Sequence, residues 1–337
     1  MDTVILSDSE ADLLKAAELI KNGSIVGIPT ETVYGLGADA ANENAVRGIF
    51  AAKGRPADNP LIVHLADFSQ AVEYTSEIPE LAWKLAEKFC PGPLTMVLPK
   101  NNRIPMVTSG GLDTVGIRVP SHTVMHRIIE LSGCPIAAPS ANTSGYPSPT
   151  TAQHVFRDMN GRIAAVVDGG QSQFGVESTV ISFDGKDAVR ILRPGAVTRE
   201  MLLEVCGSVV IDPAILHEVE AGAKVSSPGM KYKHYSPKAD IIMVEGSIGA
   251  FTELIGRSGG DSVYSLIFDG DEEVFPYRHL TYGSDSAEQA HLLFQKLREL
   301  DELGAEKVYV RAPSPEGMGL AVYNRLIRAA GFEVIRV

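Results

Sequence analysis

Segments with the pattern of buried strands alternate with segments of helical spacing along most of the chain, and this alternation most constrains its fold. Short apolar runs such as residues 24–29 and 60–65 are typical of strands, whereas residues 42–53 and 79–89 carry apolar side chains at helical spacing. Alternating elements of this kind form α/β proteins. The sequence therefore predicts an α/β domain with a large mixed sheet over residues 8–198.

Further elements of this domain follow from the same periodicities. A capping-box pattern at Ser7–Glu10 predicts a helix that runs to about Lys21 and is closed by Gly23. The other predicted helices are residues 122–133 and 151–160, and the other predicted strands are residues 94–99, 114–120, 135–141, 164–170, 178–184 and 188–195.

The last third of the chain reads as a second unit. Periodicity weakens over residues 199–237, which we interpret as an interdomain linker ending in SPGMKYKHYSP. Strand-like and helix-like segments alternate again over residues 238–337, which predicts a smaller, Rossmann-like αβ domain. That domain contains no phosphate-loop motif, and the sequence does not indicate a ligand for it.

Four loops at predicted strand ends are rich in glycine, proline, serine and threonine, and α/β sheets commonly place binding sites there. In one of them Lys53 and Arg55 flank Gly54 and are followed by Pro56, so two cations lie on a stiff, shaped turn. Such a turn indicates an anion site. Taken alone, Lys53 could equally be a helix C-terminal residue that faces water. The loops are residues 29–37, 53–60, 139–150 and 169–179.

Composition limits the nature of that anion. The net charge of −12 divides equally between residues 1–237 and 238–337, so neither part offers a broad basic face for nucleic acid. The three cysteines lie far apart without a CxxC pair, which argues against a disulfide framework or a zinc site. The acidic N-terminal segment and the lack of a long apolar run lead us to expect a cytoplasmic protein without a membrane partner.

Familiar catalytic motifs are absent. The sequence has no GxxxxGK[ST] phosphate loop, and GLGADA lacks the third glycine of a dinucleotide fingerprint. Neither GxSxG nor HExxH occurs, so a serine hydrolase or a zinc protease has no support.

Six motifs in order resemble the YrdC-like threonylcarbamoyl-AMP synthase family in its long, two-domain form. They are PTETVYGLGADA (29–40), KGRPADNPLIVHL (53–65), PGPLTMVL (91–98), GIRVPSH (116–122), APSANTSGYPSPT (138–150) and VESTVISF (176–183). The resemblance implies synthesis of threonylcarbamoyl-AMP and pyrophosphate from L-threonine, bicarbonate or CO2, and ATP. Other enzymes, the downstream threonylcarbamoyl transferase complex, would then modify tRNA.

This reaction must bring a carbamate and a triphosphate together, so the site must supply cations and positioning. Lys53, Arg55 and Arg118 are the expected catalytic residues, and Arg193 is a further cation on the ATP side. Mg²⁺ is expected to bind chiefly through ATP and water, so we predict no metal site formed by protein ligands.

The other site predictions are carried over from the motifs or from loop chemistry. For L-threonine they are Thr32, His64, Arg118, Ala138 and Ser178; for ATP they are Lys53, Arg55, Asn59, Thr114, Ser140, Asn142, Ser148 and Arg193. Each polar residue has an ordinary alternative: Thr32 could close an ST-turn, Asn59 could shape its turn, His64 could be a satisfied strand histidine, and the remaining hydroxyls could serve turns or strands.

The end of the linker carries a further hypothesis. Lys231, Tyr232 and Tyr235 are more than a spacer requires, and we expect this segment to fold over the nucleotide and exclude water, with Tyr235 as an ATP contact. Two rival functions remain at this stage. One is RNA binding, with weak tRNA affinity, and the other is a carbamoyl-phosphate-dependent enzyme of the same fold, which the lack of zinc-finger cysteines disfavours.

Overall fold

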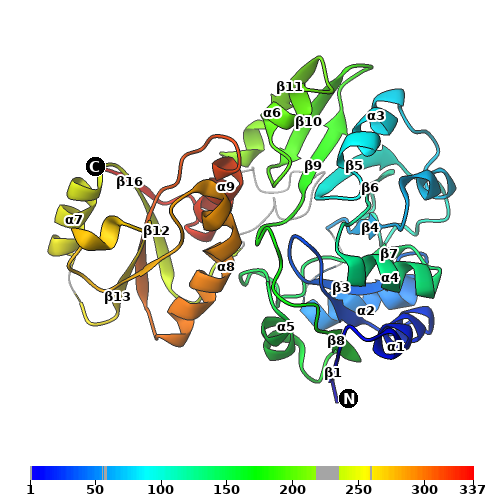
Figure 1. Ribbon diagram of the computed structural model, residues 1–337, viewed down its shortest axis with the longest axis horizontal. Helices are drawn as coiled ribbons and strands as arrows, with labels where there is room; N and C mark the ends of the chain where they lie inside the picture. Colours follow the sequence, from blue (N-terminus) through cyan, green and yellow to red (C-terminus); the bar gives the residue numbers. More distant parts are fainter. Residues whose placement is uncertain (1, 55, 57–58, 218–234, 259) are drawn as a thin grey trace.

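The computed structural model describes residues 2–54, 56, 59–217, 235–258 and 260–337, and it folds into two α/β bodies that lie side by side (Figure 1). The larger body is built on one mixed sheet. Its strands are β1 (Val4–Leu6), β2 (Val26–Ile28), β3 (Gly35–Asp39), β4 (Ile62–His64), β5 (Leu94–Pro99), β6 (Thr114–Arg118), β7 (Ile136–Ala137), β8 (Ala165–Val167), β9 (Thr179–Phe183), β10 (Ala188–Arg193) and β11 (Ser208–Ile211).

This sheet contains both parallel and antiparallel pairs, and its strand order is β1-β8-β2-β3-β7-β4-β6-β5-β9-β10-β11. One face is covered by α1 (Glu10–Lys21) and α4 (Thr123–Ser132), and the opposite face by α2 (Glu43–Lys53), α3 (Glu80–Phe89) and α5 (Ala152–Met159). Shorter helices are η1 (Phe68–Glu73), α6 (Arg199–Leu203) and η2 (Pro213–Ile215). Both faces are therefore buried, which accounts for the nearly continuous apolar strands of the sequence.

The smaller body is an all-parallel sheet with helices on both faces. Its elements are β12 (Asp240–Glu245), α7 (Ile248–Arg257), β13 (Val263–Ile267), η3 (Asp271–Glu273), β14 (His279–Thr281), α8 (Ser286–Glu302), β15 (Lys307–Arg311), α9 (Gly319–Ala329) and β16 (Val334–Arg336). The strand order is β14-β13-β15-β12-β16. Ile241 and Met243 of β12 pack with α8 and α9, whereas Ile242 and Val244 pack with α7, as a period of two requires.

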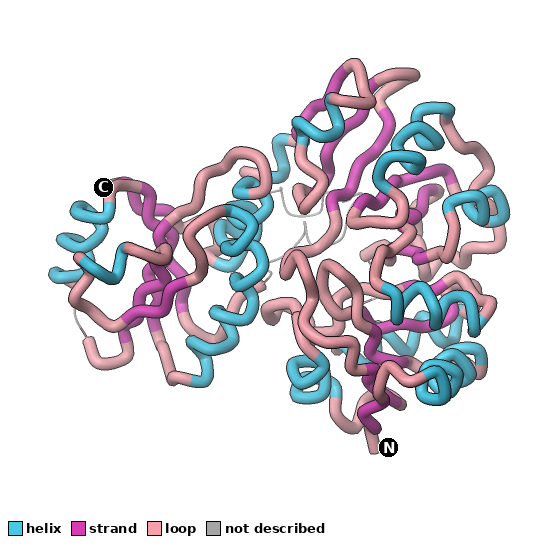
Figure 2. The backbone as a smooth tube through the Cα atoms, in the orientation of Figure 1, coloured by secondary structure: helices cyan, strands magenta, loops and turns pink. Residues whose placement is uncertain are grey.

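Helices α8 and α9 lie between the small sheet and the larger body (Figure 2). The guanidinium of Arg298 on α8 donates to both carboxylate oxygens of Asp158 on α5, at 3.0 and 2.7 Å. Asp301 accepts from the hydroxyl of Tyr146 at 2.7 Å, and Asn324 on α9 donates to the carbonyl of Ile215 at 2.7 Å. Buried polar contacts therefore join the two bodies at several points.

The predicted α/β class, with a large mixed sheet and a second smaller domain, is confirmed. Differences are local. The first helix starts at Glu10 with Ser9 as its N-cap, because Ser7 instead donates through both its amide and its hydroxyl to Asp12. Strands β1 and β14 were not predicted from the sequence. Strand β3 begins inside residues 29–37, which were predicted to form a glycine-rich loop.

The predicted linker also differs from the structure. Its first part contains α6 and β11, and β11 pairs with β10 at the edge of the large sheet. The large sheet therefore extends past residue 198, where the sequence analysis ended the first domain. Residues 218–234 lie outside the described part of the chain, as do Lys231 and Tyr232 of the linker hypothesis.

Gly195 gives a test of how tightly the turn after β10 packs. A Cβ atom there would lie 2.4 Å from the amide nitrogen of Thr179 and 2.6 Å from the carbonyl oxygen of Glu177, both of them backbone atoms that cannot move aside easily. We expect Gly195→Ala to lower the free energy of unfolding by about 1–3 kcal/mol in denaturant titrations.

Gly249→Ala is the matched control, because only Ser247 Oγ lies near that position, at 3.9 Å, and alanine favours the helix. We expect it to be neutral or to stabilise by up to about 1 kcal/mol. Equal stability of the two variants would contradict the close packing at Gly195.

Candidate active site

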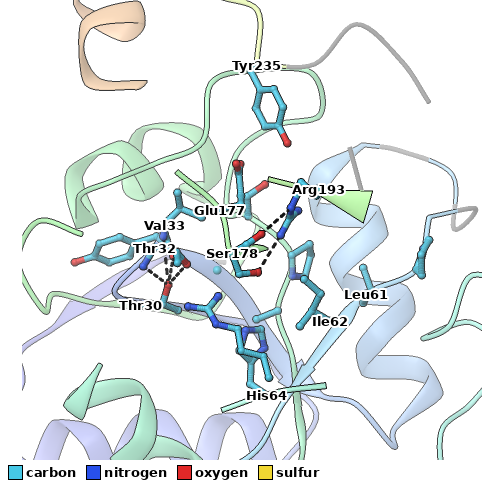
Figure 3. A pocket seen from close by; sticks show the side chains of 17 residues that line it. Thr30, Thr32, Val33, Leu61, Ile62, His64, Glu177, Ser178, Arg193 and Tyr235 are labelled. Atoms are coloured by element: carbon cyan, nitrogen blue, oxygen red, sulfur yellow. Dashed lines mark hydrogen bonds between the residues drawn. The ribbon is translucent and has the colours of Figure 1, made fainter. Parts of the chain in front are cut away.

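A small cavity opens where several strands of the large sheet end (Figure 3). It has a volume of about 60 Å³. The lining residues come from segments far apart in the sequence: Thr30, Thr32–Gly35, Pro60–Ile62, His64, Arg118, Ala138–Ser140, Glu177, Ser178, Arg193 and Tyr235. Polar side chains and cations therefore converge on one enclosed space, which is the usual form of a small-molecule site.

Arg118, the last residue of β6, is paired with a buried carboxylate. Its Nη2 lies 2.8 Å from Oε1 of Glu31, and both side chains are almost fully buried. The two atoms are close but not aligned as a hydrogen bond, so the contact is chiefly electrostatic. Burial opposes ionisation of Glu31, yet the charge of Arg118 outweighs it and holds the pKa of that carboxyl below its usual value. The pair keeps a cation at the cavity wall.

His64, the last residue of β4, is a neutral imidazole. Its Nδ1 lies 3.2 Å from the carbonyl oxygen of Ile136, and since a carbonyl only accepts, Nδ1 must carry the proton. Burial, with a smaller effect from Arg118, lowers the pKa of His64 to about 3. Nε2 is therefore left with a lone pair, which can accept a hydrogen bond from a ligand.

The hydroxyl groups of Thr30 and Thr32 share a hydrogen bond of 2.8 Å on the loop between β2 and β3. Thr30 also donates to the carbonyl of Val33 at 2.6 Å and accepts from the amide of Val33, so it is Thr30 that closes the turn. The ST-turn is therefore formed by Thr30 and not by Thr32, the residue for which it was considered. Thr32 lines the cavity.

Arg193 and Ser178 form the opposite wall, as Figure 3 shows. The guanidinium of Arg193 donates to the carbonyl and to the hydroxyl oxygen of Ser178, each at 3.1 Å. Ser178 Oγ also lies 2.8 Å from the hydroxyl of Thr95 on β5. Burial lowers the pKa of Arg193 to about 10, so the side chain is still a cation at neutral pH.

Glu177 adds a second carboxylate to the cavity, and its main partner comes from the smaller body. Arg325 on α9 donates from Nε to Oε2 of Glu177 at 2.9 Å, and the hydroxyl of Ser148 donates to Oε1. Burial opposes ionisation of Glu177, but Arg325 and Arg193 outweigh it, so the pKa of the carboxyl is lowered. Glu177 is therefore an ionised group beside the place where anionic substrates are expected.

Tyr235 closes the cavity from the side of the smaller body. Its side chain is buried, its ring lies 5.3 Å from that of Phe294 on α8, and Arg325 lies 5.8 Å from the ring centroid. Tyr235 has a positive φ of 65°, which is uncommon for a residue other than glycine. Packing against α8 and α9 therefore fixes an unusual backbone turn directly over the cavity.

Lys53 lies at the end of α2 and is buried, not directed into water. Its ammonium group donates to the carbonyl of Ser140 and, at 2.7 Å, to the carbonyl of Asn142. Asn142 in turn donates to the carbonyls of Thr143 and Tyr146, at 2.8 and 2.9 Å. In this conformation Lys53 therefore shapes the loop over residues 139–150 and is not itself part of the cavity wall.

The structure brings together most, but not all, of the predicted site residues. Those that line the cavity are Thr32, His64, Arg118, Ala138, Ser140, Ser178, Arg193 and Tyr235. Four of the predicted residues are buried but do not line the cavity: Lys53, Asn59, Asn142 and Ser148. Arg55 lies outside the described residues. Thr114 is at the opposite end of β6 from Arg118, about 13 Å away for extended chain, so this geometry gives it no contact with the cavity.

Sequence reasoning missed Thr30, Glu177 and Arg325. Thr30 and Glu177 stand inside quoted motifs, PTETVYG and VESTV, where the neighbouring residues were selected instead. Arg325 belongs to a helix whose pattern carries no chemical signal, and only the fold shows that it reaches Glu177.

Across the described ranges, no group of three or more histidine, cysteine, aspartate or glutamate side chains is arranged to hold a metal ion. The same ranges contain no helix with the length and apolar character of a membrane span.

Comparisons with known proteins agree with this site. Residues 18–195 match the model of the Sua5, YciO and YrdC family, described as telomere recombination, and residues 197–331 match the threonylcarbamoyl-AMP synthase C-terminal domain. Threonylcarbamoyl-AMP synthase of Pyrococcus abyssi is 47% identical over 332 residues, covering 96% of this chain and 95% of that protein. The enzyme of Bacillus subtilis is 43% identical over 340 residues, covering 98% and 96%.

A shorter relative and a solved structure complete the comparison. Threonylcarbamoyl-AMP synthase of Vibrio cholerae is 34% identical over 163 residues, which are 48% of this chain and 87% of that protein. The crystal structure of Pyrococcus abyssi Sua5 complexed with L-threonine superimposes with a TM-score of 0.92 at 43% identity and covers 100% of both chains. This chain therefore belongs to the two-domain threonylcarbamoyl-AMP synthases of the Sua5, YciO and YrdC family, which are enzymes of the nucleotidyltransferase type.

Proposed function

We propose that this protein makes threonylcarbamoyl-AMP and pyrophosphate from L-threonine, bicarbonate or CO2, and ATP. The observation that carries the proposal is the convergence of Arg118, Arg193 and a neutral His64 on one enclosed cavity. Support also comes from the relative that was crystallised with L-threonine. The product would pass to a threonylcarbamoyl transferase complex that modifies tRNA.

The L-threonine end of the proposed site is formed by Arg118, His64 and Thr32. A guanidinium suits a carboxylate, and Nε2 of a neutral imidazole accepts a hydrogen bond from an amino group. The hydroxyl of Thr32 and the methyl group of Ala138 would meet the side chain of the substrate. His64 would bind and orient the amino group without taking a proton from it, because its pKa of about 3 makes it a poor base at neutral pH.

The ATP end is formed by Arg193, Ser140 and Tyr235. In the proposed reaction the neutral amine of threonine adds to CO2 and releases one proton to water, which gives a carbamate. A carbamate oxygen then attacks the α-phosphorus, and the bond from this phosphorus to the oxygen that bridges to the β-phosphate breaks as pyrophosphate leaves. Arg193 would offset the repulsion between the two anions. Mg²⁺ would enter with ATP and screen the phosphate charges, held by phosphate oxygens and water. We also propose that Lys53 and Arg55 contact the phosphates of ATP.

The first test is to supply ATP, L-threonine, bicarbonate and Mg²⁺ to purified protein and to follow the adduct by mass spectrometry and the pyrophosphate by an enzymatic assay. We expect both products to depend on all three substrates. Arg118→Ala should lose activity by a factor on the order of 100 or more, because it removes the proposed carboxylate contact and leaves Glu31 buried without its partner.

Arg127→Ala is the matched control, because Arg127 forms only half-exposed ion pairs, one with Glu10 and one with Glu130. It should retain wild-type activity, since exposed pairs contribute little. Folded wild-type protein that yields neither adduct nor pyrophosphate would overturn the proposed function.

The protonation state of His64 gives a second test. The pKa of His64 is about 3 in the folded chain and 6.5 in the reference state. Between pH 3 and pH 6.5 the unfolded chain therefore binds a proton at His64 that the folded chain does not bind. Stability is therefore lost as pH falls from 6.5 toward 3, by about 2 kcal/mol at pH 5. We expect His64→Gln to show a shallower loss of unfolding free energy over this range in urea titrations. Parallel curves for the variant and the wild type would mean that folding does not lower the pKa of His64.

Tyr235 supplies a third test, of water exclusion. The cavity, at about 60 Å³, is far smaller than the roughly 300–1,000 Å³ of sites that take larger ligands, so Tyr235 must move to admit ATP and then cover it. We expect Tyr235→Ala to release more pyrophosphate than intact adduct, because water reaches the mixed anhydride. Tyr235→Phe keeps the aromatic ring, so the ratio of pyrophosphate to intact adduct should stay near one. Full adduct yield from the alanine variant would remove this role.

A further inference from the structure

The charged groups at the cavity are unequally paired. Arg118 is matched by Glu31, and Glu177 is matched by Arg325 from the smaller domain. Arg193 forms no ion pair with a carboxylate within 4.0 Å among the residues that the structure describes, and only Ser178 accepts its hydrogen bonds. Arg193 is therefore a lining cation without a carboxylate partner of its own, and it is available to the phosphates of a nucleotide provided that Glu177 stays with Arg325.

Arg325 is unusually well placed to hold Glu177. Its side chain has a relative exposure of 0%, against 8% for Glu177, so the pair is shielded from water. Besides its bond to the carboxylate, it donates to the carbonyl of Pro194 at 2.6 Å and to that of Glu177 at 3.4 Å. One guanidinium thus ties together the segment before β9, which carries Ser178, and Pro194, which directly follows Arg193 at the end of β10.

Removing this guanidinium would change the charge of the cavity. Glu177 would remain buried as an ionised carboxylate beside Arg193, which already contributes to lowering its pKa. An isolated buried charge is costly, so Glu177 would recruit Arg193 as its partner. The cation facing the ligand would then be neutralised, and the triphosphate would meet a carboxylate without compensation.

We infer that Arg325 of the C-terminal domain is a positioning residue of the active site, which holds Glu177 so that Arg193 stays available to the phosphates of ATP. This inference rests on the proposed function for the identity of the anion. The inference also assigns a role to the C-terminal domain that requires no separate ligand. The domain supplies Arg325, the counter-ion of Glu177.

The test compares full-length variants by calorimetric titration with a non-hydrolysable ATP analogue and, separately, with L-threonine. We expect Arg325→Met to weaken binding of the analogue about tenfold or more and to change L-threonine affinity by less than about threefold, because Glu177 and Arg193 lie on the nucleotide side. The double variant Glu177→Gln with Arg325→Met should recover most of the lost affinity, because it removes the uncompensated carboxylate.

Arg298→Met is the matched control for domain contact. Arg298 is a buried arginine of the same interface, paired with Asp158 at 2.7 Å, but it is not at the cavity. We expect it to lower the thermal midpoint while leaving analogue affinity within about twofold of wild type. If Arg325→Met does not fold, Arg325→Gln, whose amide can still donate to Glu177 but carries no charge, replaces it in both the single and the double variant.

Two results would overturn the inference. One is equal analogue affinity of the Arg325→Met and Arg298→Met variants, and the other is a double variant that binds no better than Arg325→Met. Wild-type protein that binds the analogue but forms no adduct would refute the proposed reaction. In that case the affinities of the variants for the analogue would still test the role of Arg325. Wild-type protein without nucleotide affinity would overturn both.

Discussion

The pairing of buried charges inside the cavity is the interaction on which the rest of the structure depends. Glu31 and Glu177 are ionised although nearly buried, and each is stable there only because a guanidinium lies against it. The large sheet brings Glu31, Arg118 and Glu177 together from separate segments, and α9 of the second domain supplies Arg325. The cavity thus contains two carboxylates of its own, each balanced by an arginine.

The sequence alone was sufficient for the class of the fold and for many of the site residues. Apolar runs and helical spacing located most of the elements, because burial on both faces of the sheet leaves a strong pattern. The motifs located Arg118, His64 and Ser178 among the residues that line the cavity, because polar residues beside apolar strands stand out in the sequence. Thr114 does not line the cavity, because it lies at the opposite end of a five-residue strand from Arg118.

What sequence could not provide is long-range geometry. Nothing in the helical pattern of residues 319–330 distinguishes Arg325 from the exposed cations of an ordinary helix, and its meaning depends on docking against a turn that ends at Gly195. Short relatives such as the Vibrio cholerae enzyme match only the first part of this chain. In this chain Glu177 and its arginine partner lie on two different bodies, so the balance of charge around the cavity is divided between them.

The separation between Glu177 and Arg325, 148 residues along the chain, has a consequence for synthesis on the ribosome. At ordinary elongation rates the arginine is added on the order of 10–30 s after the glutamate. During that interval the nascent first domain holds a carboxylate whose counter-ion does not yet exist. A chain that ended before α9 would therefore leave Glu177 without the arginine that is its ion-pair partner in the complete fold.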